Sequence, residues 1–260
     1  MRLPRQLLCP YKSSTVHKYW KCHNEEYLLS TALAKNMYSK FLSYALRHEN
    51  VSDNVSLHAF CYMDNHVHTV MSYKNGVKHL SKVMAITHTM FGQNLNKILK
   101  RKGKVGIERP KTPLIENSDN IQMKIHMYVE ANPLRAKIVN NLKDLAEYEF
   151  SSYGFYANGY KSKLTKDLEP PEWYQRLGSN SFDRQKKYRQ LFEIYLNKYG
   201  WFSSKDSKTN KLKDKGSSSF LFKRRVYFKA VMNIKRQDYS LSPLDVLKIY
   251  RRKKKIIKIE

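Results

Sequence analysis

The chain has 260 residues, with 49 Lys and Arg against 22 Asp and Glu and a formal net charge of +27. This length excludes a small peptide-like scaffold, and the charge disfavours the compact state by self-repulsion unless a polyanionic partner compensates it. Nucleic acid fits better than a membrane surface, because the basic residues are spread along the chain among 19 Tyr and 11 Phe that can stack on bases.

The lack of a targeting segment in the sequence and the spacing of its cysteines favour an intracellular setting. No stretch of the sequence has the run of apolar residues that a membrane span or a signal-peptide core requires. Cys9, Cys22 and Cys61 are widely spaced and odd in number, so they predict neither a disulfide framework nor a C-x-x-C metal site. We therefore expect a cytoplasmic protein without a membrane partner.

The first 75 residues predict a strand, a helix and a hairpin. Residues 15–22 (TVHKYWKC) are rich in aromatic and β-branched residues, which favours a strand. Residues 25–47 carry apolar side chains at steps of three and four, which is typical of an amphipathic helix. Residues 55–63 and 66–72 are β-prone runs separated by Asp64-Asn65, a dipeptide suited to a tight turn, so they predict a hairpin.

The next segments complete a β-α-β-β-α-β order. Helical spacing returns over residues 77–99, a weak strand follows at 112–116, and residues 120–131 predict another helix. Asn132-Pro133 interrupts that helix, with Asn132 as the expected N-cap of a new helical segment that reaches residue 142. This order predicts an α+β fold, a ferredoxin-like split βαβ antiparallel sheet with helices on one face.

The C-terminal part differs in character from the rest. It contains short aromatic-rich helical segments such as PPEWYQRLG and RQKKYRQLFEIYL, and residues 204–260 hold 18 Lys and Arg against 5 acidic residues. We expect a first domain over residues 1–150 and a basic, aromatic-rich helical extension over 151–260 that binds nucleic acid. The run RRKKKIIK at 251–258 is either a solvated tail or a segment that grips phosphates.

The His66-Val67-His68 motif predicts a metal-binding pair. In a strand, the two imidazoles project from the same face while Val67 points to the other. Two ligands on one rigid strand suit a metal ion. The pattern also fits two exposed strand histidines without any ligand, and this interpretation stays open at the level of the motif alone.

Tyr128 and Asn132 are the second candidate pair. If helical geometry continues through residue 132, side chains four residues apart share one face. Each residue has a simpler interpretation, Tyr128 as a packing tyrosine and Asn132 as a helix cap. His126 and Glu130, two positions to either side of Tyr128, are expected to face away from it.

Together these segments resemble a known family. CYMDNHVHTVM resembles the HUH signature of single-tyrosine transposases, and YVEANPLRAKIV resembles their tyrosine-helix signature. EFSSYGFY at 149–156 is similar to the W-S-S-Y segment of that family, with Phe150 in place of Trp. The C-terminal segments are most similar to those of the REP-associated tyrosine transposases, and the resemblance spans residues 15–195. The sequence departs from the family at residues 21–24 (KCHN), where an Arg or a Thr-Arg pair is common.

This resemblance implies a transposase-type endonuclease and strand transferase that cleaves single-stranded DNA near hairpins. It assigns His66 and His68 as metal ligands, Asn132 as the third protein ligand, and Tyr128 as a nucleophile that forms a 5′-phosphotyrosine link. Two imidazoles and an amide oxygen leave positions open for phosphate and water, which favours Mg²⁺ or Mn²⁺ over a closed zinc site. The implied partners are single-stranded or hairpin DNA, and the protein would be a monomer or a homodimer.

Basic residues near these motifs and in the extension are expected to contact the DNA. They are Lys21, Arg109, Lys111, Arg135, Arg224, Arg225, Arg251 and Arg252.

Three other functions share part of this pattern. A catalytically silent hairpin-binding protein or repressor could share the fold. A zinc hydrolase would need further His or Asp ligands, and a two-histidine phosphoesterase would need paired H-x-[ST] repeats, which the sequence lacks. Among the other histidines, His58 is expected to be a satisfied strand residue, and we assign no role to His17, His23, His79 and His88, which lack a partner pattern.

Overall fold

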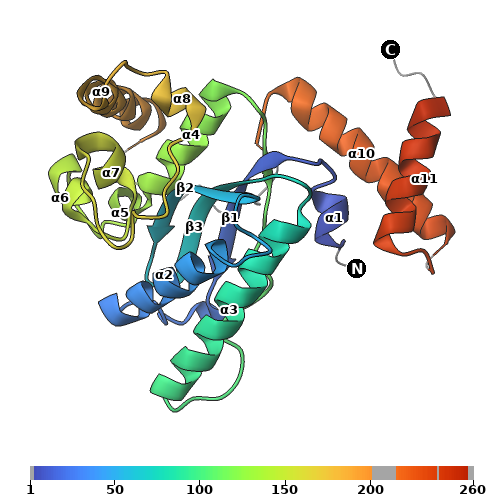
Figure 1. Ribbon diagram of the computed structural model, residues 1–260, viewed down its shortest axis with the longest axis horizontal. Coiled ribbons are helices and arrows are strands. Elements are labelled where there is room, and N and C mark those ends of the chain that lie inside the picture. Colours follow the sequence, from blue (N-terminus) through green and yellow to red (C-terminus); the bar gives the residue numbers. More distant parts are fainter. Residues whose placement is uncertain (1–2, 201–214, 239, 257–260) are drawn as a thin grey trace.

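The computed structural model describes residues 3–200, 215–238 and 240–256, and four antiparallel strands form its sheet (Figure 1). The order across the sheet is β2-β3-β1-β4. A chain with the order β-α-β-β-α-β produces this arrangement when it folds as a split βαβ sheet, so the predicted fold class is confirmed. The strands are β1 (Ser14–Lys21), β2 (Val55–Tyr62), β3 (His66–Tyr73) and β4 (Leu114–Ile115).

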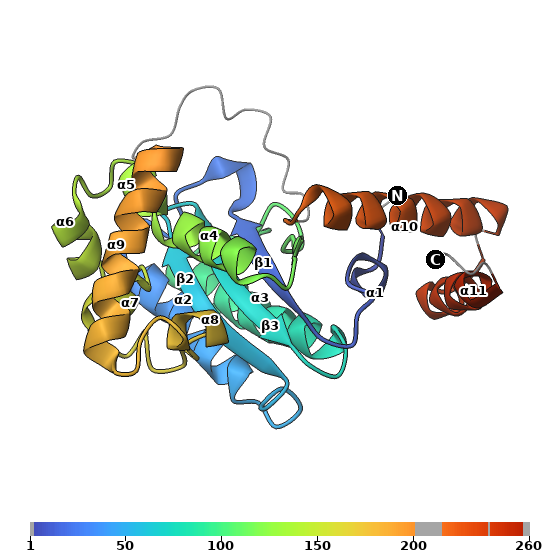
Figure 2. The same cartoon turned by 90° about the horizontal axis from the view of Figure 1, so that it is seen from above.

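Helices cover both faces of the sheet, whereas the sequence predicted helices on one face only. The two crossover helices, α2 (Ala32–Leu46) and α3 (Lys78–Ile98), pack together on one face, as expected. The opposite face is covered by α4 (Asp119–Glu130), which contacts β2 and β3 (Figure 2). The remaining helical segments are α1 (Arg5–Leu8), η1 (His23–Glu25), α5 (Asn132–Arg135), α6 (Leu142–Glu147), α7 (Tyr153–Asn158), α8 (Glu172–Gln175), α9 (Ser181–Tyr199), α10 (Ser218–Gln237) and α11 (Pro243–Ile256).

Local backbone chemistry shifts three predicted helix boundaries. The helix predicted from residue 25 is α2, and it begins at residue 32. The side chain of Thr31 accepts a hydrogen bond from the backbone N–H of Ala34 and so caps α2 there. The segment expected to continue to residue 142 ends after α5, where Lys137 adopts a positive φ of 57° that a helix does not allow. Asn132 is not the N-cap of α5; Ala131 occupies that position, and no side chain caps this short helix.

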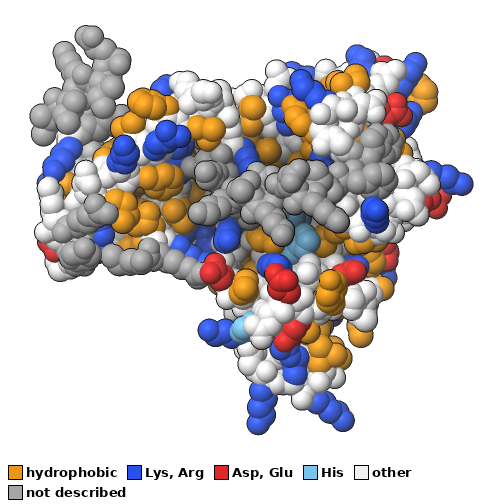
Figure 3. Space-filling model, turned by 180° about the vertical axis from the view of Figure 1, so that it is seen from behind, with side chains coloured by type: hydrophobic (Ala, Val, Ile, Leu, Met, Phe, Trp, Pro, Cys, Tyr) orange, Lys and Arg blue, Asp and Glu red, His pale blue; other side chains and the backbone are white. Residues whose placement is uncertain are grey.

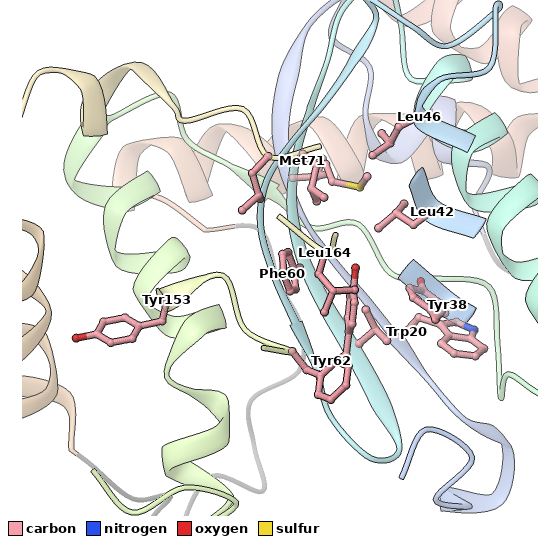
Figure 4. Packing of buried hydrophobic residues seen from close by; sticks show 14 of the residues in the cluster. Trp20, Tyr38, Leu42, Leu46, Phe60, Tyr62, Met71, Tyr153 and Leu164 are labelled. Carbon is pink, nitrogen blue, oxygen red and sulfur yellow. The ribbon is translucent and has the colours of Figure 1, made fainter. Parts of the chain in front are cut away.

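The main core lies between the sheet and the crossover helices. Side chains alternate between the two faces of a strand, so Val16, Lys18 and Trp20 of β1 point toward α2 and α3. The ring of Trp20 stacks 5.7 Å from that of Tyr38, and the ring of Tyr38 meets that of Tyr62 at 5.5 Å (Figure 4). Aromatic pairs at these distances add to the free energy gained from burying their apolar area.

The C-terminal part divides into two packing groups. The aromatic side chains of α7, α8 and α9, including Tyr153, Trp173 and Tyr188, belong to the main core. By contrast, α10 and α11 form a separate cluster with α1, in which Tyr227, Val231 and Val246 are buried. The domain boundary expected at residue 150 stays a prediction. In the structure, the side chains of α7 to α9 pack into the same core as the sheet.

Two contacts attach α10 to the sheet. Lys215 forms a parallel bridge with Ile115, so that the backbone N–H of Lys215 donates to Leu114 O and that of Glu116 donates to Lys215 O, each at 2.7 Å. The carboxylate of Glu116 then accepts hydrogen bonds from the backbone N–H and the hydroxyl of Ser217, the N-cap of α10.

Of the basic run expected at 251–258, residues 251–256 are helical and the last two lie outside the described residues.

None of the helices in the described ranges is long and apolar enough to cross a membrane.

Lys18 is a buried cation within the main core. Its side chain is 1% exposed, and its ammonium donates to the hydroxyl of Tyr38, whose oxygen lies 3.2 Å from His88 Nε2. Burial lowers the pKa of Lys18 to about 7, and the nearby positive charge of Arg5 adds to this effect.

We predict that Lys18→Met stabilises the protein at pH 7 and that this advantage shrinks as the pH rises. The folded pKa lies below the ordinary value of 10.5, so above about pH 7 the unfolded chain holds a proton that the folded chain has released. The free energy of unfolding of the parent therefore rises between pH 7 and about pH 10. That of the variant does not, because Met carries no proton to release. Urea unfolding of both proteins across this range measures the gap, and a gap independent of pH would contradict the assignment.

Candidate active site

The candidate site lies on the sheet face that α4 covers. On β3, His66 and His68 point to this face while Val67 is buried on the other, and their ring centroids are 4.9 Å apart. Across the β1–β3 pairing, Lys21 lies opposite His66 and Tyr19 lies opposite His68. The ring of Tyr19 packs 5.5 Å from that of His66 and 4.9 Å from that of His68, so both histidines are held against one aromatic side chain.

His17 is a member of the site that the sequence did not identify. It is fully buried, its Nε2 lies 2.8 Å from Nδ1 of His68, and the two rings stack with centroids 5.0 Å apart. No described residue forms a hydrogen bond with the other ring nitrogen, Nδ1. Alternation along β1 places residues 17, 19 and 21 on one face, but only the register of β1 against β3 brings His17 to His68.

Tyr128 lies on α4 beside His17 and His68. Its ring centroid is 5.7 Å from that of His17 and 5.9 Å from that of His68, and both contacts are edge-on. Burial raises the pKa of the Tyr128 hydroxyl, while the guanidinium of Arg135, centred 5.1 Å from the ring, opposes the rise. Arg135 is itself held by a 2.7 Å hydrogen bond to the hydroxyl of Tyr195 on α9.

The amide of Asn132 is oriented by the end of α4. Its Nδ2 donates to the backbone carbonyls of Tyr128 at 2.8 Å and of Val129 at 3.1 Å. These bonds use the donor end of the amide, so the oxygen Oδ1 is the end left for another partner.

The protonation of the two strand histidines suits metal binding. Burial lowers the pKa of His66 to about 4, with the charge of Lys21 adding to the effect, and burial lowers the pKa of His68 well below its ordinary value. Both imidazoles are therefore neutral near pH 7. Nδ1 of His66 is engaged by Asn65 Oδ1 at 2.6 Å, and Nδ1 of His68 by His17, so each ring keeps Nε2 for a ligand bond.

The donor set also limits what the third ligand can be. Among the described residues, no three His, Cys, Asp or Glu side chains are grouped so that they could hold a metal ion. Within the described ranges, a third protein ligand would therefore be an uncharged oxygen donor such as the amide of Asn132. That Asn132 is this ligand, and that the ion is Mg²⁺ or Mn²⁺, stay predictions.

A buried polar cluster holds α4, and therefore Tyr128, against the sheet. The carboxylate of Glu130 is fully buried and accepts hydrogen bonds from Ser152 Oγ at 2.6 Å and from the Tyr188 hydroxyl at 2.5 Å. Ser152 also bonds to the backbone of Phe60 on β2. His126 lies on the same side of α4, with Nε2 3.2 Å from Glu130, so both residues face away from the histidine pair as the helical spacing predicted.

The segment with the sequence EFSSYGFY supplies this link. Its backbone joins the outer edge of β2, where Tyr62 N donates to Phe150 O and Ser151 forms a bridge with Cys61. The segment therefore has a structural function, which is to connect α4 to the strand next to β3.

The residues expected to contact DNA occupy three different environments. Lys21 forms a 2.6 Å ion pair with Glu25, and Arg109 donates to the backbone of Leu3. Lys111, Arg225 and Arg252 are exposed.

Two of the expected DNA contacts bind within the protein, although Arg251 is itself exposed and stays a predicted DNA contact. Arg224 is 2% exposed and donates to the carbonyl of Leu8, and Arg251 donates to the carbonyl of Pro10. These bonds tie the C-terminal helices to the N-terminal segment, so we do not retain Arg224 as a DNA ligand. His58 bonds to Glu169 O and Ser72 Oγ, as expected of a satisfied strand residue.

Comparison with known proteins gives likenesses among solved structures only. The chain is similar to a solved structure of a REP-associated tyrosine transposase bound to a REP hairpin, with 16% sequence identity and a TM-score of 0.46. The similarity covers 62% of this chain and 94% of that one. No protein-family model matches the chain, and no curated protein does.

Proposed function

We propose that this protein is a metal-dependent endonuclease and strand transferase that cleaves single-stranded DNA near hairpins, with Tyr128 as its nucleophile. The observation that supports the proposal is the position of Tyr128, whose ring lies within 5.9 Å of the ring of His68 although the two residues come from separate elements. A phenol beside His68, a neutral imidazole that could bind a metal ion, is the combination that a tyrosine nucleophile and a metal site require.

His66, His68 and the amide oxygen of Asn132 are the residues that would hold Mg²⁺ or Mn²⁺. When bound, the ion would polarise the scissile phosphate and balance the charge that develops on it. The neutral state of both histidines at pH 7 means that no proton has to leave before an ion binds.

The chain itself supplies the nucleophile and its surroundings. The hydroxyl oxygen of Tyr128 forms a bond to phosphorus, and the bond from phosphorus to the 3′ oxygen breaks with its electron pair leaving on that oxygen. The products are a 5′-phosphotyrosine and, after protonation, a free 3′ hydroxyl, so the phosphodiester bond energy is kept for rejoining. The hydroxyl must lose its proton to solvent water; burial raises its pKa, and the cation of Arg135 near the ring opposes that rise.

His17 would act as a positioning residue for His68. If His68 binds the ion through Nε2, its Nδ1 carries a proton and donates to Nε2 of His17, which must then accept. This bond fixes both the tautomer and the ring orientation of the ligand, which is the function that partners of metal-bound histidines generally have.

We predict that Tyr128→Phe abolishes the covalent adduct while DNA binding survives, because the change removes one oxygen and keeps the ring. The adduct between protein and the 5′ end of a labelled hairpin-containing strand is detected on a denaturing gel. Tyr19→Phe is the matched control, since it removes a hydroxyl from a ring that packs against the same histidines and should leave the adduct intact.

The gel has two outcomes that would contradict the assignment. An undiminished adduct in Tyr128→Phe would assign the nucleophile to another residue. A parent protein that binds the hairpin but never forms an adduct would favour a silent hairpin-binding protein or repressor.

We further predict that His66→Ala and His68→Ala each abolish Mn²⁺ binding and that His17→Phe weakens it by roughly 10- to 100-fold, the usual cost of losing a partner of a ligating histidine. Calorimetric titration without DNA measures the affinity, and His79→Gln on α3 is the control. Equal affinity in His17→Phe and the parent would remove His17 from the positioning role, whereas unchanged binding in both alanine variants would place the ion elsewhere.

A further inference from the structure

We propose that a groove between α10 and residues 108–113 is a second DNA site, which holds a few nucleotides of single-stranded DNA next to the catalytic centre. The inference rests on the proposed function for the choice of DNA as the ligand. It concerns residues outside the catalytic set, so it can be tested separately.

The groove is a cavity of about 910 Å³. One wall is the face of α10 that presents Arg225, Phe228 and Lys229, and the other is the segment before β4 that includes Arg109 and Lys111. Seen from behind in Figure 3, the side of the molecule where the C-terminal helices lie carries basic side chains next to apolar ones.

The cations of the groove fall into two classes. Arg5, Arg109 and Arg224 donate to backbone carbonyls, so they help to fix the walls. Lys111, Arg225 and Lys229 are exposed, and within the described ranges no hydrogen bond or ion pair engages their side chains. Glu108 is the one acidic side chain among the described residues that line the cavity. The available charge is therefore positive and selects an anionic ligand.

The size and the apolar surface indicate single-stranded rather than duplex DNA. A cavity of about 910 Å³ lies near the upper limit for sites that enclose a small ligand, ~1,000 Å³, which suits a few nucleotides of a single strand better than a duplex. Phe228 together with Leu221 and Met232 forms an apolar surface between the cations. Aromatic and apolar surfaces for bases beside cations for phosphates are typical of single-strand sites.

The groove adjoins the catalytic centre through β1. The backbone N–H of Lys111 donates to Tyr19 O at 2.8 Å, and that of Tyr19 donates to Lys111 O at 2.9 Å. The ring of Tyr19 is the one that packs against His66 and His68. A strand of DNA seated in the groove would therefore reach the histidine pair across a single residue of β1.

The attachment of α10 determines whether the groove exists. The bridge between Ile115 and Lys215 and the hydrogen bonds from Ser217 to Glu116 bring α10 to the segment before β4. Part of the charge excess of residues 204–260 is thus placed at a defined site on the sheet domain.

The double charge reversal Arg225→Glu with Lys229→Glu tests the proposal. Both side chains are exposed on a helix, so the fold should persist, which circular dichroism checks. The matched control is Lys223→Glu with Lys248→Glu, which makes the same change of charge at exposed positions of α10 and α11 that do not line the groove. All proteins carry Tyr128→Phe and no divalent ion is added, so that cleavage does not affect the result.

Fluorescence anisotropy is measured with a labelled mixed-sequence single strand and with a blunt duplex over several salt concentrations. The groove variant should bind the single strand more weakly, with the slope of log affinity against log salt lower by about 1.4, or ~0.7 for each of two lost phosphate contacts. Duplex binding should change no more than in the control.

Equal losses in the groove variant and its control, an unchanged salt slope, or a loss confined to the duplex would each overturn the proposal. The proposed function is tested separately, because the adduct and metal-binding experiments use proteins in which the groove is intact.

Discussion

The antiparallel register of β1 against β3 is the constraint on which the candidate site depends. It sets Tyr19 opposite His68 and brings His17 to the same histidine, while the intervening Trp20 and Val67 fill the core on the other face. A slip of one residue would reverse the faces and bury polar rings in the apolar core. The apolar side chains that stabilise the fold therefore also determine the positions of the site histidines.

Much of the fold and part of the site follow from local patterns. The turn at Asp64-Asn65 and the two β-prone runs beside it predicted the hairpin, and the period of two placed His66 and His68 on one face. Helical spacing likewise placed Tyr128 on the side of α4 away from His126 and Glu130. These features depend on residues close in sequence, which is why the sequence alone is sufficient to predict them.

Other features arise from contacts between distant parts of the chain. His17 and His68 are 51 residues apart and meet only because β1 pairs with β3 in one register. Arg224 appeared to be a DNA ligand because of its charge, but its contact with Leu8, 216 residues away, makes it part of a core between the two ends of the chain. The groove beside α10 has no sequence signal either, since its walls come from segments more than 100 residues apart.

The central claim is that Tyr128 and the His66–His68 pair form one metal-dependent centre, and NMR of the tyrosine rings with added Mn²⁺ tests it most directly. A bound paramagnetic ion broadens the signals of nearby nuclei. The Tyr128 resonance, assigned by its loss in Tyr128→Phe, should broaden well before that of Tyr250 on α11, and it should stay sharp when His66 and His68 are both replaced by Ala. A sharp Tyr128 signal in the presence of saturating Mn²⁺, or equal broadening of both tyrosines, would contradict the account.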